Sequence, residues 1–255
     1  MNLLDGAPCD QLPVDDPAIG NGMAVFEALR TYERRPFRPL AHLERLRASA
    51  VWFGFACADD AVFLNEIEQV VALEPDECSV LVTLTGGGRR LVRSRALDLS
   101  RVGAPLRVAT LAFEAPPWLP GWVKHTNRAG WVLAAAKAGV DEVLFVGSDG
   151  TWTEANRSNV FAVRDGVLLT PPENGRILRG VTRGALIEAA REAGVPVREA
   201  PLFPGPVDEL YLASTLKELA PVVELNGAAA PGRGPVGERI LATFRHRIRI
   251  EQRRA

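Results

Sequence analysis

A proline-rich run at residues 115–121, with the sequence APPWLPG, is the clearest break in this 255-residue chain. Proline fixes φ at about −65° and lacks a backbone N–H, so neither a helix interior nor a central strand continues through such a run. The hydrophobic fraction of 47% is enough to fill one large core or two modest ones. The sequence therefore predicts two parts, residues 1–115 and 122–255, joined by a linker at 116–121.

Strand and helix patterns alternate in both parts, which predicts an α/β fold class. In the first part we expect strands at 24–32, 79–85, 91–99 and 106–113, and helices at 40–53 and 60–73. In the second part we expect helices at 127–138, 180–193 and 235–251, and strands at 142–146, 160–163, 167–170, 195–198, 209–213 and 222–225.

The charge and cysteine content narrows the classes of function. With 30 basic and 31 acidic residues, the net charge of −1 gives no electrostatic reason to expect a nucleic-acid partner. Cys9, Cys57 and Cys78 have neither paired nor metal-binding spacing, so no metal site is expected. No apolar run is long enough to cross a bilayer, and the first residues lack a signal-peptide pattern. We therefore expect a cytoplasmic protein without a membrane partner.

Lys124 is the strongest candidate for a chemically active residue. It closely follows the proline-rich run and is the only lysine between residues 1 and 136, in a chain that otherwise uses arginine for positive charge. A lysine ammonium can lose its proton when it is desolvated, whereas a guanidinium cannot. Lys124 is therefore a candidate Schiff-base amine.

Two other segments offer groups that suit a phosphate. Gly180 precedes a predicted helix whose first turn contains Val181 and Thr182, and such a turn presents free N–H groups. Taken alone, this pattern is better explained as an ordinary glycine entry into a helix, because short motifs often match by chance. Thr215 follows an apolar strand, where its hydroxyl either caps a turn or donates to a phosphate.

Two charged residues have similarly divided interpretations. Arg45 lies beside the apolar stripe of the helix predicted at 40–53, where a snorkelling surface arginine is the ordinary interpretation. Glu154 lies between a turn and an apolar strand. It is either a charge at the edge of a sheet or a carboxylate that holds the proton of a pyridinium ring.

The order of these segments resembles the class IV aminotransferase family of fold-type IV pyridoxal-phosphate enzymes, from about residue 20 to 223. That family includes branched-chain aminotransferases, D-amino acid aminotransferases and 4-amino-4-deoxychorismate lyases. The matching pieces are VFE at 25–27, HLERLRASA at 42–50, KHTNR at 124–128, DEVLF at 141–145, TE at 153–154 with SNVF at 158–161, LRGVTR at 178–183 and PV at 221–222.

The resemblance implies a role for each candidate. Lys124 forms the Schiff base with pyridoxal 5′-phosphate, and Glu154 pairs with the pyridine nitrogen. Arg45 binds the phosphate. Val181, Thr182 and Thr215 assist it. The resemblance further implies a small N-terminal α/β domain, a larger β-rich C-terminal domain with helices, and a homodimer whose subunits share the active site.

The resemblance favours the lyase branch, which releases pyruvate and 4-aminobenzoate in the folate pathway. The chain is short for a branched-chain aminotransferase, and no tyrosine follows Lys124 closely. The alternatives are a small amino-acid aminotransferase of branched-chain or D-amino acid type, and a family member that binds without catalysis. Ala28 departs from the lyase pattern, because many lyases carry threonine at this position.

The residues that contact the substrate are expected on two segments. The resemblance implies Phe26 and Ala28 on the strand at 24–32, and Arg89 in the loop at 86–90 as a ligand for a substrate carboxylate. A solvated hairpin tip is an equally good interpretation of Arg89. His125 is interpreted as a structural neighbour of Lys124, since adjacent side chains on an extended segment point to opposite sides.

Overall fold

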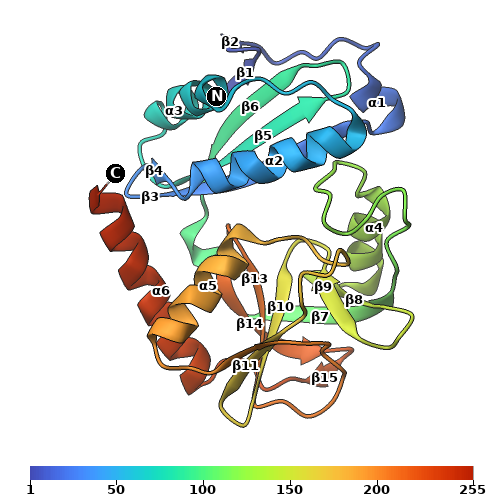
Figure 1. Ribbon diagram of the computed structural model, residues 1–255, viewed down its shortest axis with the longest axis vertical. Coiled ribbons are helices and arrows are strands. Elements are labelled where there is room, and N and C mark those ends of the chain that lie inside the picture. The colour runs from blue at the N-terminus through green and yellow to red at the C-terminus, as the bar shows by residue number, and fades with distance from the viewer. Residues whose placement is uncertain (255) are drawn as a thin grey trace. The chain divides into compact units, whose positions relative to one another are not determined.

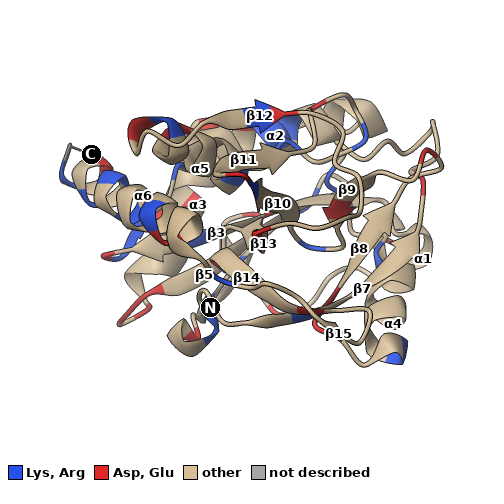
Figure 2. Ribbon diagram, turned by 90° about the horizontal axis from the view of Figure 1, so that it is seen from below, with Lys and Arg blue, Asp and Glu red and all other residues tan. Residues whose placement is uncertain are grey.

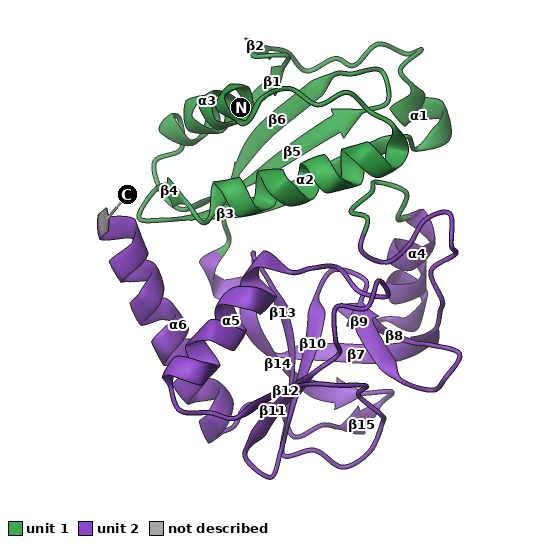
Figure 3. Ribbon diagram, in the orientation of Figure 1, with its two compact units in different colours: residues 1–98, 123–128 green, residues 99–122, 129–255 purple. Residues whose placement is uncertain are grey.

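The chain folds into two compact units, shown in different colours in Figure 3. The structure, a computed structural model, describes residues 1–254. Unit 1 contains residues 1–98 and 123–128, and unit 2 contains residues 99–122 and those from 129 onward. Among residues 1–254, no helix combines the length and apolar character needed to span a membrane. The α/β class expected from the alternating patterns is confirmed.

Unit 1 is built on one antiparallel sheet with the strand order β2-β1-β6-β5-β3-β4. Its strands are β1 (Asn2–Leu4), β2 (Ala7–Pro8), β3 (Ala24–Tyr32), β4 (Arg35–Pro36), β5 (Cys78–Thr85) and β6 (Arg90–Ala96). The long central pair β3–β5 keeps a regular register from Ala24↔Thr85 to Arg30↔Ser79. The strand expected at 91–99 is therefore present but ends at Ala96.

Helices α2 (Pro39–Phe53) and α3 (Asp60–Ala72) pack against this sheet, and α1 (Pro17–Asn21) is a short helix near its edge (Figure 1). Proline at the first position of α2 suits a helix start, because the N–H it lacks would have no partner within the helix. The helix ends at Gly54, whose φ of 72° needs a residue without Cβ strain. Most of the apolar residues whose spacing predicted both helices are part of the unit 1 core.

Side chains alternate along β3 between the helix-covered face and the opposite face. Val25 and Leu29 belong to the core with α2 and α3, and Glu27 reaches side chains of α2. Phe26 and Ala28 point the other way because successive strand residues face opposite sides. The strand thus carries its buried carboxylate under α2 and its candidate substrate residues on the opposite face.

Residues 123–128 extend the edge of β3. The Phe26 N–H donates to the carbonyl of Lys124 at 3.0 Å, and the Thr126 N–H donates to the carbonyl of Ala24 at 3.0 Å. Val25 and His125 form an antiparallel bridge. These backbone bonds place the lysine segment in unit 1.

The two units therefore differ from the division that the proline run predicts. The expected linker at 116–121 lies within unit 2, and the Lys124 segment belongs to unit 1 although it was expected in the second part. The residues before the linker also belong to unit 2, because β7 (Leu106–Ala112) pairs in parallel with β8 (Glu142–Val146) and β14 (Glu218–Leu225). Strand pairing across long sequence separations leaves no local sequence signal, so the proline run alone did not reveal this exchange.

Unit 2 contains a nine-stranded sheet with the order β12-β11-β10-β13-β14-β7-β8-β9, and β15 pairs with β14. Its further strands are β9 (Trp152–Ala155), β10 (Asn159–Arg164), β11 (Val167–Thr170), β12 (Val197–Glu199), β13 (Glu209–Ser214) and β15 (Ala228–Ala229). The pairing Asn159↔Glu154 joins β10 to β9, so the strands from β10 to β9 form a closed ring.

Three α-helices accompany this sheet: α4 (Ala129–Ala138), α5 (Val181–Glu192) and α6 (Pro235–Arg254). Helix α4 connects the parallel strands β7 and β8. Acidic and basic residues are interspersed on α6 (Figure 2), where Arg247 pairs with Glu188 and Glu192 of α5. Ion pairs thus join the two C-terminal helices.

Most unit 2 elements lie close to where the patterns predicted them, but strands β9, β14 and β15 differ from the prediction. Strand β14 begins at Glu218 and not at residue 222. The sequence did not show this earlier start, because Pro221 lacks the N–H that a central strand uses and so argues against a strand through it. Strand β9 was not expected, because only four residues carry its pattern. This short strand is important because it carries Glu154.

Candidate active site

Lys124 is held by contacts on both its backbone and its side chain. Its backbone N–H donates to Ser49 Oγ of α2 at 3.0 Å, and its carbonyl accepts the Phe26 N–H. Its Nζ lies 4.7 Å from the centre of the Phe26 ring. A cation over an aromatic face is attracted by the ring quadrupole. The amine is therefore directed over Phe26, the residue expected to contact substrate.

His125 faces the opposite way from Lys124, in the register of the Val25 bridge, and is buried. Burial, followed by the positive charges of Arg128 and Lys124, lowers the pKa of His125 to about 4. A neutral, buried ring agrees with the interpretation of His125 as a structural neighbour.

Arg45 forms a two-pronged ion pair with Glu27. Its Nε donates to Oε1 at 2.7 Å and its Nη2 donates to Oε2 at 2.6 Å. His42, one helical turn earlier on α2, contacts Glu27 Oε2 through Nδ1 at 2.7 Å. Glu27 and His42 are fully buried, whereas the Arg45 side chain is 10% exposed. Glu27 therefore fixes the guanidinium in place through two hydrogen bonds.

The charge states in this cluster follow from its contacts. Burial raises the pKa of Glu27, but the charge and hydrogen bonds of Arg45, with the hydrogen bond from His42, outweigh it and bring the pKa to about 2. Burial lowers the pKa of His42 against the opposing effect of Glu27. Neutral His42 with its proton on Nδ1 is the tautomer that donates to the Glu27 carboxylate.

The sequence reasoning identified Arg45 but assigned no role to Glu27 or His42. Both lie in segments that carried the family resemblance. A further signal was present, because Glu27 occupies a position of β3 that faces the core, and a carboxylate there requires a partner.

Glu154 is positioned within unit 2 by neutral donors. Its Oε2 accepts the Leu178 N–H at 3.0 Å and Asn159 Nδ2 at 3.4 Å. Asn159 Nδ2 also donates to the Leu178 carbonyl at 3.0 Å. The carboxylate is thus tied to the segment that leads into α5.

The start of α5 offers donors of the kind that an anion requires. Gly180 is its N-cap, and among the described residues no side chain caps the first turn. Thr182 Oγ1 lies 3.1 Å from Thr215 Oγ1, so two hydroxyls meet beside this turn. A Cβ at Gly180 would lie 2.0 Å from Asn159 Oδ1, so any larger residue at this helix start would have to displace Asn159. Thr182 and Thr215 are therefore brought together, with Val181 beside Thr182 in the first turn of α5, and their role at a phosphate stays a prediction.

The two other expected substrate residues occupy different settings. Ala28 lies half-buried on the face of β3 that carries Phe26. Arg89 lies beyond the end of β5, where its Nη1 donates to Asp5 Oδ2 at 3.0 Å and its side chain is 48% exposed. The structure thus groups Phe26, Ala28 and Lys124, whereas Arg89 belongs to an exposed hairpin.

The chain matches the amino-transferase class IV family over residues 24–225. It is 30% identical to the branched-chain-amino-acid aminotransferase of Escherichia coli (strain K12), over 89% of this chain and 84% of that protein. It is 29% identical to the D-alanine aminotransferase of Listeria innocua serovar 6a, over 88% of this chain and 86% of that protein.

A solved structure with the same fold carries pyridoxal phosphate. It is the PLP-bound form of a hypothetical aminotransferase from Mycobacterium tuberculosis, with a TM-score of 0.87 and 27% identity. The alignment covers 96% of this chain and 97% of that one. A second form of that protein, with alpha-ketoglutarate and PMP bound, aligns with a TM-score of 0.85 and 28% identity, over 92% of each chain.

Proposed function

Because the chain belongs to the amino-transferase class IV family, whose members use pyridoxal phosphate, we propose that it exchanges an amino group between an amino acid and a 2-oxo acid. The names of its relatives, branched-chain-amino-acid and D-alanine aminotransferases, support this proposal. The observation that carries it is the placement of Lys124, whose amine is held over Phe26 by the bonded edge of β3.

The residues of each unit fit parts of the cofactor. Unit 1 provides a lysine amine and a guanidinium fixed by Glu27. Unit 2 provides a carboxylate and, at the start of α5, backbone N–H groups with two hydroxyls. The amine suits an aldehyde, the guanidinium, N–H groups and hydroxyls suit a phosphate, and the carboxylate suits a protonated pyridine nitrogen. Glycine at position 180 keeps the N-terminus of α5 free of a side chain.

When bound, pyridoxal phosphate supplies an aldehyde that condenses with amines and a ring that accepts electron density. We assign the chain's own residues the following work. Lys124 Nζ holds the cofactor and then, as a neutral amine, moves the proton at the substrate carbon that carries nitrogen. Glu154 holds a proton on the ring nitrogen. Arg45, Val181, Thr182 and Thr215 bind the phosphate and orient the ring.

The lyase activity that the sequence favoured differs from this proposal in one measurable requirement. A lyase releases its product from a single substrate, whereas an aminotransferase needs both an amino donor and a 2-oxo acceptor. The relatives' names favour the aminotransferase, and Ala28 departs from the usual threonine of the lyases. The retained Lys124, Glu154 and Arg45 argue against a non-catalytic protein.

The test is an assay of the purified protein with pyridoxal phosphate and pairs of substrates. We expect L-leucine, L-valine or D-alanine to yield its 2-oxo acid only when 2-oxoglutarate or pyruvate is also present. The Lys124→Ala variant should fold and lose this turnover. Conversion of aminodeoxychorismate to 4-aminobenzoate without an acceptor would establish the lyase instead, and failure to take up pyridoxal phosphate would reject both.

The homodimer with a shared active site and the cytoplasmic location remain predictions from the sequence. Sedimentation of the holoenzyme at micromolar concentration tests the first.

A further inference from the structure

Glu142, at the first position of β8, is a fully buried carboxylate with three donors. Its Oε1 accepts Ser158 Oγ at 2.9 Å and is paired with Lys217 Nζ. Its Oε2 accepts the Arg157 N–H at 3.2 Å. A buried carboxylate persists only when such partners compensate its desolvation. Its donors come from two segments that are distant in the sequence.

The first segment is the turn between β9 and β10. The Ala155 N–H donates to the Ser158 carbonyl at 2.7 Å, which closes the turn. Glu142 holds the turn at residues 157 and 158, directly before Asn159. Asn159 in turn donates to Glu154 and to the Leu178 carbonyl. The position of the Glu154 carboxylate therefore depends on a turn that Glu142 anchors.

The second segment is the connection between β13 and β14. The Lys217 N–H donates to the Ser214 carbonyl at 3.1 Å, so residues 214–217 form a tight turn. Thr215 lies in this turn, and its hydroxyl meets that of Thr182 on α5. The Lys217 ammonium, 19% exposed, fixes the turn to Glu142.

We propose that Glu142 is a positioning residue that holds these two turns at a fixed spacing, so that Glu154 and Thr215 are aligned for the ring and the phosphate of one cofactor. This inference rests on the proposed function, which assigns those two residues to the cofactor. The carboxylate touches neither substrate nor cofactor in this role. Its effect passes through Asn159 on one side and through the turn of Lys217 on the other.

The test compares two buried carboxylates of unit 2. Glu209, 2% exposed, accepts the Tyr211 hydroxyl and the Gly237 N–H at the opposite end of β13 from Ser214. Glu142→Gln and the control Glu209→Gln should both lower the unfolding temperature of the cofactor-free protein. Only Glu142→Gln should weaken pyridoxal phosphate binding, by about tenfold, as outer contacts do for bound groups.

A second pair of variants separates positioning from stability. Lys217→Met should weaken cofactor binding even if Glu142→Gln does not fold. When Thr215→Val is already present, adding Glu142→Gln should reduce pyridoxal phosphate affinity by a smaller factor than Glu142→Gln does in the wild type. The reason is that part of the effect of Glu142 acts through Thr215.

Equal cofactor affinity in Glu142→Gln, Glu209→Gln and the wild type would overturn the inference and leave the proposed function intact. The inference would also be overturned if the affinity losses of Glu142→Gln and Thr215→Val added fully in the double variant while Lys217→Met bound the cofactor as the wild type does. A wild-type protein that fails to bind pyridoxal phosphate would instead reject the proposed function, and this inference with it.

Discussion

Arg45 and Glu27 are joined by two hydrogen bonds, Nε to Oε1 at 2.7 Å and Nη2 to Oε2 at 2.6 Å. One partner lies on α2 and the other on β3, so the pair ties the helix to the strand beneath it. The same strand carries Phe26 on its other face and binds the Lys124 segment along its edge. This pair therefore stabilises the element on which the candidate amine depends.

We predict that breaking this pair destabilises the protein strongly. Arg45→Met leaves the fully buried Glu27 carboxylate without its cation and should cost about 3 kcal/mol in the free energy of unfolding. The double variant with Glu27→Leu should cost less than the sum of the single changes, because it removes both charges. Urea unfolding of Arg45→Met, Glu27→Leu and the double variant measures the three free energies.

Arg47→Met, on the same helix, is the matched control for the Arg45 variants. Arg47 pairs with Asp60, and both side chains are about 40% exposed. An exposed pair contributes up to about 1 kcal/mol. Equal losses for Arg45→Met and Arg47→Met would contradict the structural importance of the buried pair.

The pH dependence of stability should include a contribution from His125. Its pKa is about 4 in the folded protein and 6.5 in the unfolded chain, because burial and the charges of Arg128 and Lys124 disfavour protonation. Above pH 6.5 the His125 ring is neutral in both the folded and the unfolded state, so it causes no loss of stability there. As the pH falls from 6.5 to 4, the unfolded state binds a proton that the folded state does not, so stability decreases.

His125→Phe should therefore flatten this part of the stability curve, as measured by unfolding temperature at half-unit steps of pH. Some decrease will persist, because the pKa of buried His42 is lowered too and acts in the same direction. Glu27, with a pKa of about 2, adds a loss that begins below its unfolded value of 4.5. An unchanged slope between pH 6.5 and 4 in His125→Phe would show that His125 does not titrate in this way.

The sequence predicted local features well because their causes are local. Apolar spacing predicted a helix at 40–53, which the structure shows as Pro39–Phe53. The roles that the ordered motifs imply for Lys124 and Arg45 stay predictions. Contacts between distant segments were not predictable from one sequence. Glu142 and Lys217 lie 75 residues apart, and only the parallel and antiparallel pairings of the unit 2 sheet bring them together.

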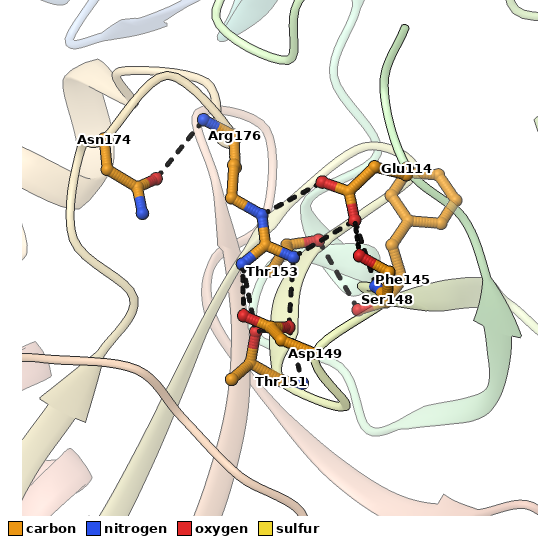
Figure 4. Close-up of polar contacts among 8 residues, drawn as sticks. All are labelled: Glu114, Phe145, Ser148, Asp149, Thr151, Thr153, Asn174 and Arg176. Carbon is orange, nitrogen blue, oxygen red and sulfur yellow. Dashed lines mark hydrogen bonds and ion pairs between the residues drawn. The ribbon is translucent and has the colours of Figure 1, made fainter.

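The segment before α5 is clamped by Arg176, and we predict that loss of the clamp loosens it. Figure 4 shows Arg176 between Glu114 and Asp149, with Nε 3.1 Å from Glu114 Oε1 and Nη1 2.7 Å from Asp149 Oδ2. Hydrogen bonds from Arg176 and Thr151 hold the pKa of Asp149 well below its usual range.

Arg176→Gln should increase cleavage of residues 171–180 in limited proteolysis, with only a small fall in unfolding temperature, because the ion pairs are partly exposed. Arg107→Gln, which removes the exposed pair with Glu224, is the control. Equal proteolysis of the two variants would show that the clamp does not restrain this segment.

The final prediction concerns two glycines of the α5 region, Gly180 at the N-cap and Gly184 inside the helix. A Cβ at Gly180 would lie 2.0 Å from Asn159 Oδ1, whereas a Cβ at Gly184 meets nothing within 4 Å. Gly180→Ala must displace Asn159, which donates to Glu154 and to the Leu178 carbonyl. Overpacking of this kind costs about 1–3 kcal/mol.

Gly180→Ala should therefore lower both stability and pyridoxal phosphate affinity, since Asn159 helps to place Glu154 and the start of α5. Gly184→Ala should leave cofactor affinity unchanged and should raise stability by up to about 1 kcal/mol, because alanine favours a helix interior over glycine. Unfolding and cofactor titration on the same preparations separate the two effects. If Gly180→Ala bound the cofactor as tightly as Gly184→Ala, the helix entry would have no part in the site.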